Sequence, residues 1–165
     1  CLDIGASPGG FTDCLLQYGA AKVYSVDVGY GQFDWTLRQD VRVKVIERTN
    51  IRQLAYEVIN EKMDIIVADT SFISLKVVIP SAEKFMRDNT LVLALIKPQF
   101  EAGKQNVGKG GVVKDPEIRK LVINELKFFF KERGYLINQI IPSPILGPKG
   151  NKEYIISLNF KKNSN

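Results

Sequence analysis

The sequence predicts an α/β fold with a doubly wound, mostly parallel sheet and helices on both faces. The first observation is an alternation of short apolar segments with helical segments of about 10–15 residues, which is typical of βαβ units. The second is a glycine-rich turn, Gly5 to Gly10, between the first strand and the first helix. The third is that later apolar strands end in charged residues, at Asp27, Asp69 and Lys97. Because ligands of open α/β sheets bind at the carboxyl ends of the strands, these residues are candidate site residues.

Composition limits the class of protein. The chain has 165 residues, 45% of them apolar and 25% charged, which fits a soluble globular domain with a core of its own. No apolar run approaches the ~20 residues of a membrane span. The two cysteines, Cys1 and Cys14, form no disulfide framework, so we expect a reducing cytoplasm. The absence of histidine excludes Ser-His-Asp and Cys-His catalysis and any His-ligated metal site. The net charge of +5 permits an RNA partner.

The glycine turn is the first candidate ligand site. A strand over residues 1–4 breaks at the turn, and a helix follows with a predicted buried stripe. Such a break brings backbone N–H groups and a helix N-terminus close to a ligand. Phe11 and Thr12 follow Gly10 where a phosphate loop needs Lys and Ser/Thr, and Ser7 replaces the middle glycine of a dinucleotide motif. NTP and dinucleotide ligands are therefore disfavoured. The stripe consists of Phe11, Cys14, Leu15 and Tyr18.

The next strands supply two polar residues. The segment 22–27 is a strand that ends in Asp27, which lies 22 residues after Gly5, where an acidic residue commonly bonds ribose hydroxyls. The alternative is an Asp that caps a turn. The segment 41–47 is a third strand, and Asn50 either caps a helix over 51–61 or contacts a ligand. One residue could do both.

Two further strands point at a reaction zone. The strand over 63–69 ends in Asp69, and the doubly wound order places it beside the first strand, although Asp69 could also cap the following helix. That helix, over 73–86, is interrupted by Pro80. The strand over 90–96 ends in Lys97, which could orient or deprotonate an alcohol, or simply extend its ammonium to solvent.

The rest of the chain completes the sheet. Segment 102–114 is rich in glycine and lysine and is either a mobile basic loop suited to a phosphate backbone or a solvated connection. Asp115 and Pro116 begin a helix that ends at Gly134. Strands over 135–142 and 154–160 follow, and 161–165 is a polar tail. The predicted buried stripe of the helix is Ile118, Leu121, Val122 and Phe129.

Several motifs carry a resemblance to a known family. The stretch Asp3-x-Gly5-x-Ser7-Pro8-Gly9-Gly10-Phe11 resembles the first motif of S-adenosyl-L-methionine (SAM) methyltransferases of the FtsJ type. Over the whole chain the sequence resembles the TlyA family, whose members carry the name hemolysin and have a FtsJ-like rRNA 2′-O-methyltransferase domain. The resemblance implies a Rossmann-like SAM-dependent methyltransferase fold of seven strands, the last one antiparallel. The other motifs are Gly29-Tyr-Gly-Gln32, Glu47-Arg-Thr-Asn50, Ser71-Phe-Ile-Ser-Leu75, Lys97-Pro-Gln-Phe-Glu101 and Gly108-Lys-Gly-Gly-Val112.

The resemblance also implies site residues. FtsJ-type enzymes use a Lys-Asp-Lys-Glu set, whose last three members match Asp69, Lys97 and Glu153. The first lysine and a small N-terminal RNA-binding domain would lie upstream, so residues 1–165 would be the methyltransferase domain of a longer protein. The start at Cys1, inside a strand and without a methionine, agrees with a fragment. The residues implied to bind SAM, with Asp3 facing its ammonium group and Asn50 near its adenine, are Asp3, Gly5, Ala6, Ser7, Pro8, Gly9, Gly10, Phe11, Asp27, Val28, Asn50 and Asp69.

The implied reaction is methyl transfer to a ribose 2′-hydroxyl of ribosomal RNA or ribosomal subunits, without a metal. Asp69-Thr-Ser-Phe lacks the Asn/Asp-Pro-Pro-aromatic pattern of enzymes that methylate base amines, which favours a hydroxyl acceptor. Three alternatives are a cytolytic or membrane-interacting protein, a nicotinamide-dependent oxidoreductase and a SAM-binding module without catalysis. The sequence contains no spanning segment and no strongly amphipathic cationic helix that would support the first alternative. Ser7 and Lys97 count against the second, and the catalytic set counts against the third for the parent protein, but not for the fragment alone.

Overall fold

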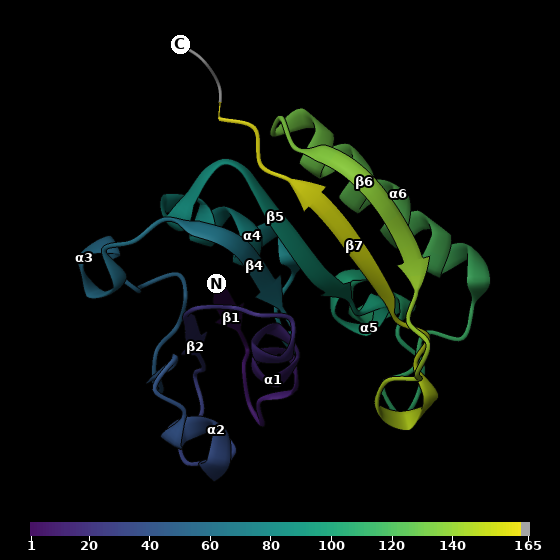
Figure 1. Ribbon diagram of the computed structural model, residues 1–165. Helices are drawn as coiled ribbons and strands as arrows, with labels where there is room; N and C mark the ends of the chain where they lie inside the picture. Colours follow the sequence, from purple (N-terminus) through teal and green to yellow (C-terminus); the bar gives the residue numbers. More distant parts are fainter. Residues whose placement is uncertain (163–165) are drawn as a thin grey trace.

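The computed structural model describes residues 1–162, so the end of the predicted polar tail, 163–165, lies outside the described residues. The chain forms one seven-stranded sheet with the order β3-β2-β1-β4-β5-β7-β6 (Figure 1). Neighbours among β1 to β5 pair in parallel, and β7 runs antiparallel to both β5 and β6. The predicted fold class is thereby confirmed. The strands are β1 Leu2–Ile4, β2 Val23–Val26, β3 Val43–Ile46, β4 Met63–Ala68, β5 Met86–Ile96, β6 Leu136–Pro142 and β7 Tyr154–Asn159.

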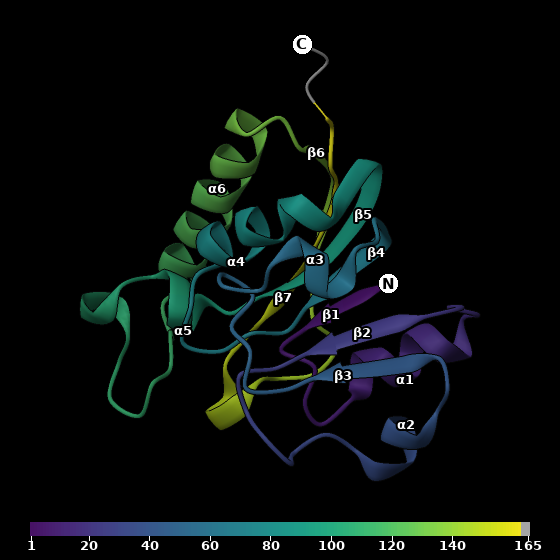
Figure 2. The same cartoon turned by 90° about the vertical axis from the view of Figure 1, so that its left-hand side faces the viewer.

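Helices lie on both sides of the sheet. Helices α1 (Gly10–Gln17) and α2 (Trp35–Gln39) cover one face near β1 to β3, whereas α3, α4 and α6 lie over the other face (Figure 2). The core sits between that second layer and the central strands, where Ile66, Val92 and Ile156 are fully buried. The remaining helices are α3 Tyr56–Ile59, α4 Leu75–Ala82, α5 Pro98–Glu101 and α6 Pro116–Glu132, with 3₁₀ turns at Glu83–Phe85, Lys104–Asn106 and Pro148–Gly150.

The strand register sets the position of the site. Ile4 of β1 pairs with Val26 of β2 on one side and with Ala68 of β4 on the other. The carboxyl ends of these three strands therefore lie level. The residues that follow them, Gly5, Asp27 and Asp69, come together at one edge of the sheet, as expected for a doubly wound fold.

Two predicted helices are shorter than expected. Residues 51–53 form a turn and only Tyr56–Ile59 is helical, because Asn50 accepts a hydrogen bond from the Arg52 amide (3.0 Å) and Asn60 ends the helix in a left-handed conformation. The helix predicted over 73–86 is α4, which contains Pro80 but ends at Ala82 before a 3₁₀ turn. By contrast, α6 begins as predicted, with the Asp115 side chain accepting from the Glu117 amide at 2.9 Å.

The buried stripe predicted for α1 is wrong. Thr12 and Leu16 are the buried residues, whereas Cys14 is exposed and Tyr18 is 89% exposed. The physical reason is a polar contact: the Thr12 hydroxyl donates to Asp3 Oδ2 (2.7 Å) and shares a hydrogen bond with the Ser25 hydroxyl (2.8 Å). A threonine with two buried partners turns the helix away from the apolar stripe.

The stripe predicted for α6 is partly wrong. Val122 faces the core with Leu126 and Phe130, but Leu121 is 50% exposed. Here too a polar side chain takes a buried position, because the Arg119 guanidinium donates to the Val113 and Lys114 carbonyls (3.0 and 2.8 Å). No helix in the described part of the chain is long and apolar enough to cross a membrane.

Candidate functional site

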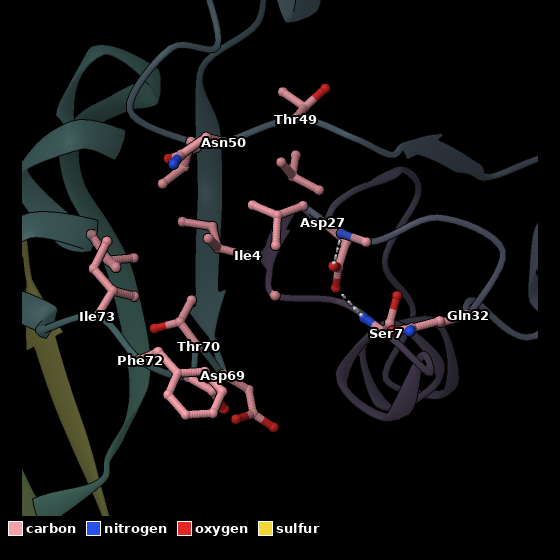
Figure 3. Close-up of a pocket in the computed structure, with 17 residues that line it drawn as sticks. Ile4, Ser7, Asp27, Gln32, Thr49, Asn50, Asp69, Thr70, Phe72 and Ile73 are labelled. Carbon is pink, nitrogen blue, oxygen red and sulfur yellow. Dashed lines mark hydrogen bonds between the residues drawn. The ribbon is translucent and has the colours of Figure 1, made fainter. Parts of the chain in front are cut away.

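A pocket of about 530 Å³ opens at the carboxyl ends of β1, β2 and β4 (Figure 3). Its volume lies in the range of small-molecule sites, and its position is the usual ligand position of open α/β sheets. The predicted residues that line it are Gly5, Ser7, Asp27, Val28, Asn50 and Asp69.

Gly5 lets two strand ends approach closely. Its φ of 76° lies in the left-handed region, and a Cβ at this position would overlap the backbone carbonyl oxygen of Asp69. The Gly5 amide meanwhile donates to the Val26 carbonyl at 2.9 Å. Glycine is therefore required both by the conformation and by the contact with the end of β4.

Asp27 holds two loops beside the pocket. Its two carboxylate oxygens accept hydrogen bonds from the backbone amides of Ser7 (2.9 Å) and Gly29 (2.7 Å), as Figure 3 shows. Each oxygen has a further lone pair, so the carboxylate can still accept from a ligand hydroxyl. The turn-forming and ligand-binding interpretations of Asp27 are thus compatible.

Asn50 can likewise both cap a turn and contact a ligand. Its side-chain oxygen accepts from the Arg52 amide, which stabilises a turn rather than the predicted longer helix. The residue lines the pocket together with Thr49 and Ile51. Its amide nitrogen, a donor of two hydrogen bonds, has no partner among the described residues and is free to meet a ligand.

Asp3 lies behind the pocket wall. It is 1% exposed, its Oδ2 accepts from the Thr12 hydroxyl, and its Oδ1 has no hydrogen-bond partner among the described residues. Burial raises the pKa of Asp3 to about 6, and the nearby negative charge of Asp69 acts in the same direction. A carboxyl kept partly protonated near pH 6 is unusual for a purely structural aspartate.

The other residues of the first motif lie away from the main pocket. Ala6 is buried, and Phe11 is half-buried outside the pocket lining. Pro8, Gly9 and Gly10 line a second, smaller cavity of about 340 Å³ beside α2. Their contact with the cofactor stays a prediction.

Asp69 and Lys97 form an ion pair at the pocket. Lys97 Nζ lies 2.5 Å from Asp69 Oδ1 in an ion pair, and it donates to the Ser71 hydroxyl at 3.3 Å. The lysine side chain is only 11% exposed, whereas the aspartate side chain is 37% exposed. Lys97 is thus a shielded cation whose charged partner faces the open pocket.

Glu153 reaches the same region from the antiparallel strand. Ile96 pairs with Tyr154, so the register places Lys97 opposite Glu153 at the ends of β5 and β7. The Glu153 side chain is buried, and its Oε1 accepts from Gln99 Nε2 at 2.8 Å. The structure therefore brings Asp69 and Lys97 into contact and holds Glu153 nearby through Gln99.

Sequence reasoning missed several residues of this site. Thr70 and Phe72 line the pocket, Ser71 contacts Lys97, and Gln99 holds Glu153. All four lie within four residues after the end of β4 or β5, and that position is the signal that could have identified them. No group of three potential metal ligands occurs among the described residues.

The fold and the site place the chain in a broad structural class. The strand order with an antiparallel β7 inside the sheet, and the pocket beside β1, are those of Rossmann-like methyltransferases. One solved neighbour is the fibrillarin/Nop5p complex, with a TM-score of 0.69 at 18% identity over 96% of this chain and 71% of that chain.

The family can be stated more narrowly. The model of the FtsJ-like methyltransferase family matches residues 1–160, and the chain belongs to that family. A Mycobacterium tuberculosis protein named 16S/23S rRNA (cytidine-2′-O)-methyltransferase TlyA is 48% identical over 96% of this chain, which spans 59% of the relative. The crystal structure of a "putative hemolysin" from Lactococcus lactis has a TM-score of 0.92 at 40% identity, over 96% of this chain and 76% of that one. The resemblance to the TlyA family is confirmed.

Proposed function

We propose that this chain is the catalytic domain of a SAM-dependent methyltransferase that acts on a ribose 2′-hydroxyl of ribosomal RNA. The observation that carries the proposal is the ion pair of Asp69 and Lys97 at the wall of the pocket. The name of the M. tuberculosis relative supports ribosomal RNA as the substrate. In this proposal residues 1–165 are the methyltransferase domain, an RNA-binding domain precedes it, and the protein works on ribosomes in the cytoplasm.

The residues of the pocket fit SAM. Ser7 Oγ and Thr70 Oγ1 are buried atoms that line the pocket and have no hydrogen-bond partner among the described residues. Buried polar atoms without partners are costly, so a polar ligand that bonds them stabilises the site. Asp27 and Asn50 would hold the ribose and adenine of the cofactor, and Asp3 would favour its ammonium group. When bound, SAM supplies a methyl group on a sulfonium, which is already a good leaving group.

The acceptor hydroxyl would be handled by the chain's own residues. The Lys97 ammonium has three N–H donors, and Asp69 and Ser71 are its two partners. A further N–H can therefore bind the oxygen of an acceptor hydroxyl and assist the loss of its proton. Asp69, through its ion pair, and Glu153, opposite the lysine in the strand register, would position Lys97 and set its charge. Alignment of the two reactants supplies much of the rate.

The test is substitution of the lysine. Lys97→Ala should lower methyl transfer by about 10²- to 10⁴-fold, the usual contribution of a general acid–base group, while SAM affinity stays within a few-fold of wild type. Transfer is measured on unmodified ribosomal subunits, and SAM affinity by calorimetry with NADH as the control ligand. Alkaline hydrolysis of the product RNA checks the position, because a 2′-O-methylated nucleotide resists cleavage.

Lys76→Ala is the matched control. Lys76 is another lysine with a carboxylate partner, Glu125 at 3.2 Å, but it lies on α4 away from the pocket. This variant should keep full activity. Loss of SAM binding in Lys97→Ala would refute the role given to the lysine, and absence of SAM binding by the wild-type protein would refute the methyltransferase.

A further inference from the structure

Two loops beside the reaction zone carry the entire net charge of the chain. Loop A, residues 102–114, contains Lys104, Lys109 and Lys114, and loop B, residues 143–152, contains Lys149 and Lys152. Neither loop contains an acidic residue. Since the net charge is +5, the other basic and acidic residues of the chain balance.

These five lysines are free to bind an anion. All five are exposed, and none has a hydrogen-bonded or ion-paired side-chain nitrogen among the described residues. Several basic residues elsewhere form ion pairs, as in Arg38–Glu47 (2.7 Å) and Arg133–Glu83 (2.9 Å). Unpaired lysines gathered in two loops that contain no acidic residue are the usual electrostatic footprint of nucleic-acid binding.

A buried asparagine joins the two loops. Asn151 of loop B is 3% exposed, its Nδ2 donates to the Gly111 carbonyl (2.9 Å), and its Oδ1 accepts from the Val113 amide (3.1 Å). Arg119 of α6 ties the end of loop A through the Val113 and Lys114 carbonyls. Loop A, for which the sequence left a mobile basic loop and a solvated connection open, is thus anchored at its second half, and the two loops form one unit.

The unit borders the candidate catalytic residues on both sides. Loop A follows α5, which begins directly after Lys97, and loop B ends directly before Glu153. In Figure 1 the two loops leave the sheet at the same end, below β7 and beside α5. A chain of nucleotides whose acceptor ribose reaches Lys97 would therefore pass along these lysines.

We propose that loops A and B form one phosphate-binding surface for the RNA backbone next to the acceptor nucleotide, with Asn151 as the positioning residue that joins them. The inference rests on the proposed function for its substrate. Lysine suits this task because its ammonium is a compact charge that binds phosphate without base specificity.

The experiment measures the salt dependence of RNA binding by the full-length protein. The probe is an unmodified ribosomal RNA transcript, and the variants are Lys104→Gln/Lys109→Gln in loop A and Lys149→Gln/Lys152→Gln in loop B. Each lysine that contacts a phosphate contributes about 0.7–0.9 to the slope of log K against log salt. Each double variant should therefore reduce the slope by about 1.5. The control Lys120→Gln/Lys127→Gln removes the same charge from exposed positions of α6 and should leave the slope unchanged.

A second measurement tests Asn151. Asn151→Ala keeps all five lysines but removes the hydrogen bonds that join loop B to loop A. If the loops then separate, KM for RNA should rise about tenfold, while kcat and SAM affinity stay at wild-type values. In this background the loop B substitutions should cost less than in the wild type, as expected for coupled sites.

The outcomes separate this inference from the proposed function. Equal slopes for the loop variants and the α6 control would overturn it, as would an effect from one loop alone. Asn151→Ala with unchanged KM would overturn the positioning role. The slopes are read from binding, so they stand even if the wild-type protein transfers no methyl group, which would refute only the proposed reaction.

Discussion

The chain has two glycine-rich stretches, and the structure uses them in opposite ways. In the first, Gly5 to Gly10, two of the three glycines fill crowded positions: a Cβ on Gly5 would overlap the Asp69 carbonyl, and one on Gly9 would lie 2.5 Å from Leu37. In the second, in loop A, a Cβ on Gly110 would meet nothing within 4 Å. Gly5 and Gly9 are thus required for space as well as for their positive φ, whereas Gly110 is required for its backbone conformation alone. Glycine content therefore does not identify a close-packed binding turn, but the neighbours of each glycine do.

The largest effect is expected at Gly5. Gly5→Ala combines a left-handed conformation, which costs about 1–2 kcal/mol, with overpacking against backbone, which costs about 1–3 kcal/mol. We expect the free energy of unfolding to fall by about 3–4 kcal/mol and SAM affinity to fall by at least about 100-fold as the end of β4 moves. Urea unfolding and calorimetry measure the two. A variant with wild-type stability would show that the two strand ends can separate freely.

The next largest effect concerns the carboxyl beneath the first stretch. Burial raises the pKa of Asp3 from 3.8 to about 6, so between about pH 4 and about pH 6 the folded state holds a proton that the unfolded state has lost. The free energy of unfolding should therefore fall as the pH rises through this window, by about 3 kcal/mol. Asp3→Asn should remove this fall and be more stable than wild type at pH 7.5. Parallel pH profiles of the two proteins in urea unfolding would exclude Asp3 as the source.

The smallest effect is expected in loop A. Gly110 has a φ of 86° and open space around it, so Gly110→Ala should cost only the left-handed conformation, about 1 kcal/mol, and leave SAM affinity unchanged. The same two measurements check it. A loss of SAM affinity here would show that loop A supports the cofactor pocket, and would remove the contrast between the two stretches.

The fold was largely predictable because it depends on where strands end. Alternating apolar and amphipathic segments predict βαβ units, and parallel neighbours bring Asp27, Asp69 and Lys97 to one edge without any knowledge of contacts. The helix faces were harder to predict. In α1 and α6 the buried positions include Thr12 and Arg119, whose partners are an aspartate of β1 and carbonyls of loop A. Apolar periodicity does not register a buried polar side chain.

The site was also predictable only in part. The ion pair of Asp69 and Lys97 follows from topology, since their strands are neighbours in the sheet. The hydrogen bond from Gln99 to Glu153 was not predictable, because it depends on α5 turning back toward β7 after Lys97. The role of Asn151 was hidden for the same reason, since its partners lie 40 and 38 positions earlier in the chain.

The place of β7 has a consequence for biosynthesis. It is the last strand among the described residues, yet it lies inside the sheet between β5 and β6. In a nascent chain β1 to β5 can pair with one another, but β5 keeps an open edge and β6 has no partner until β7 leaves the ribosome. Glu153 and loop B reach their positions only with that strand. The β1 to β5 part of the sheet, which holds the pocket, can thus fold during translation before β7 is made, whereas Glu153 and loop B are placed only afterwards.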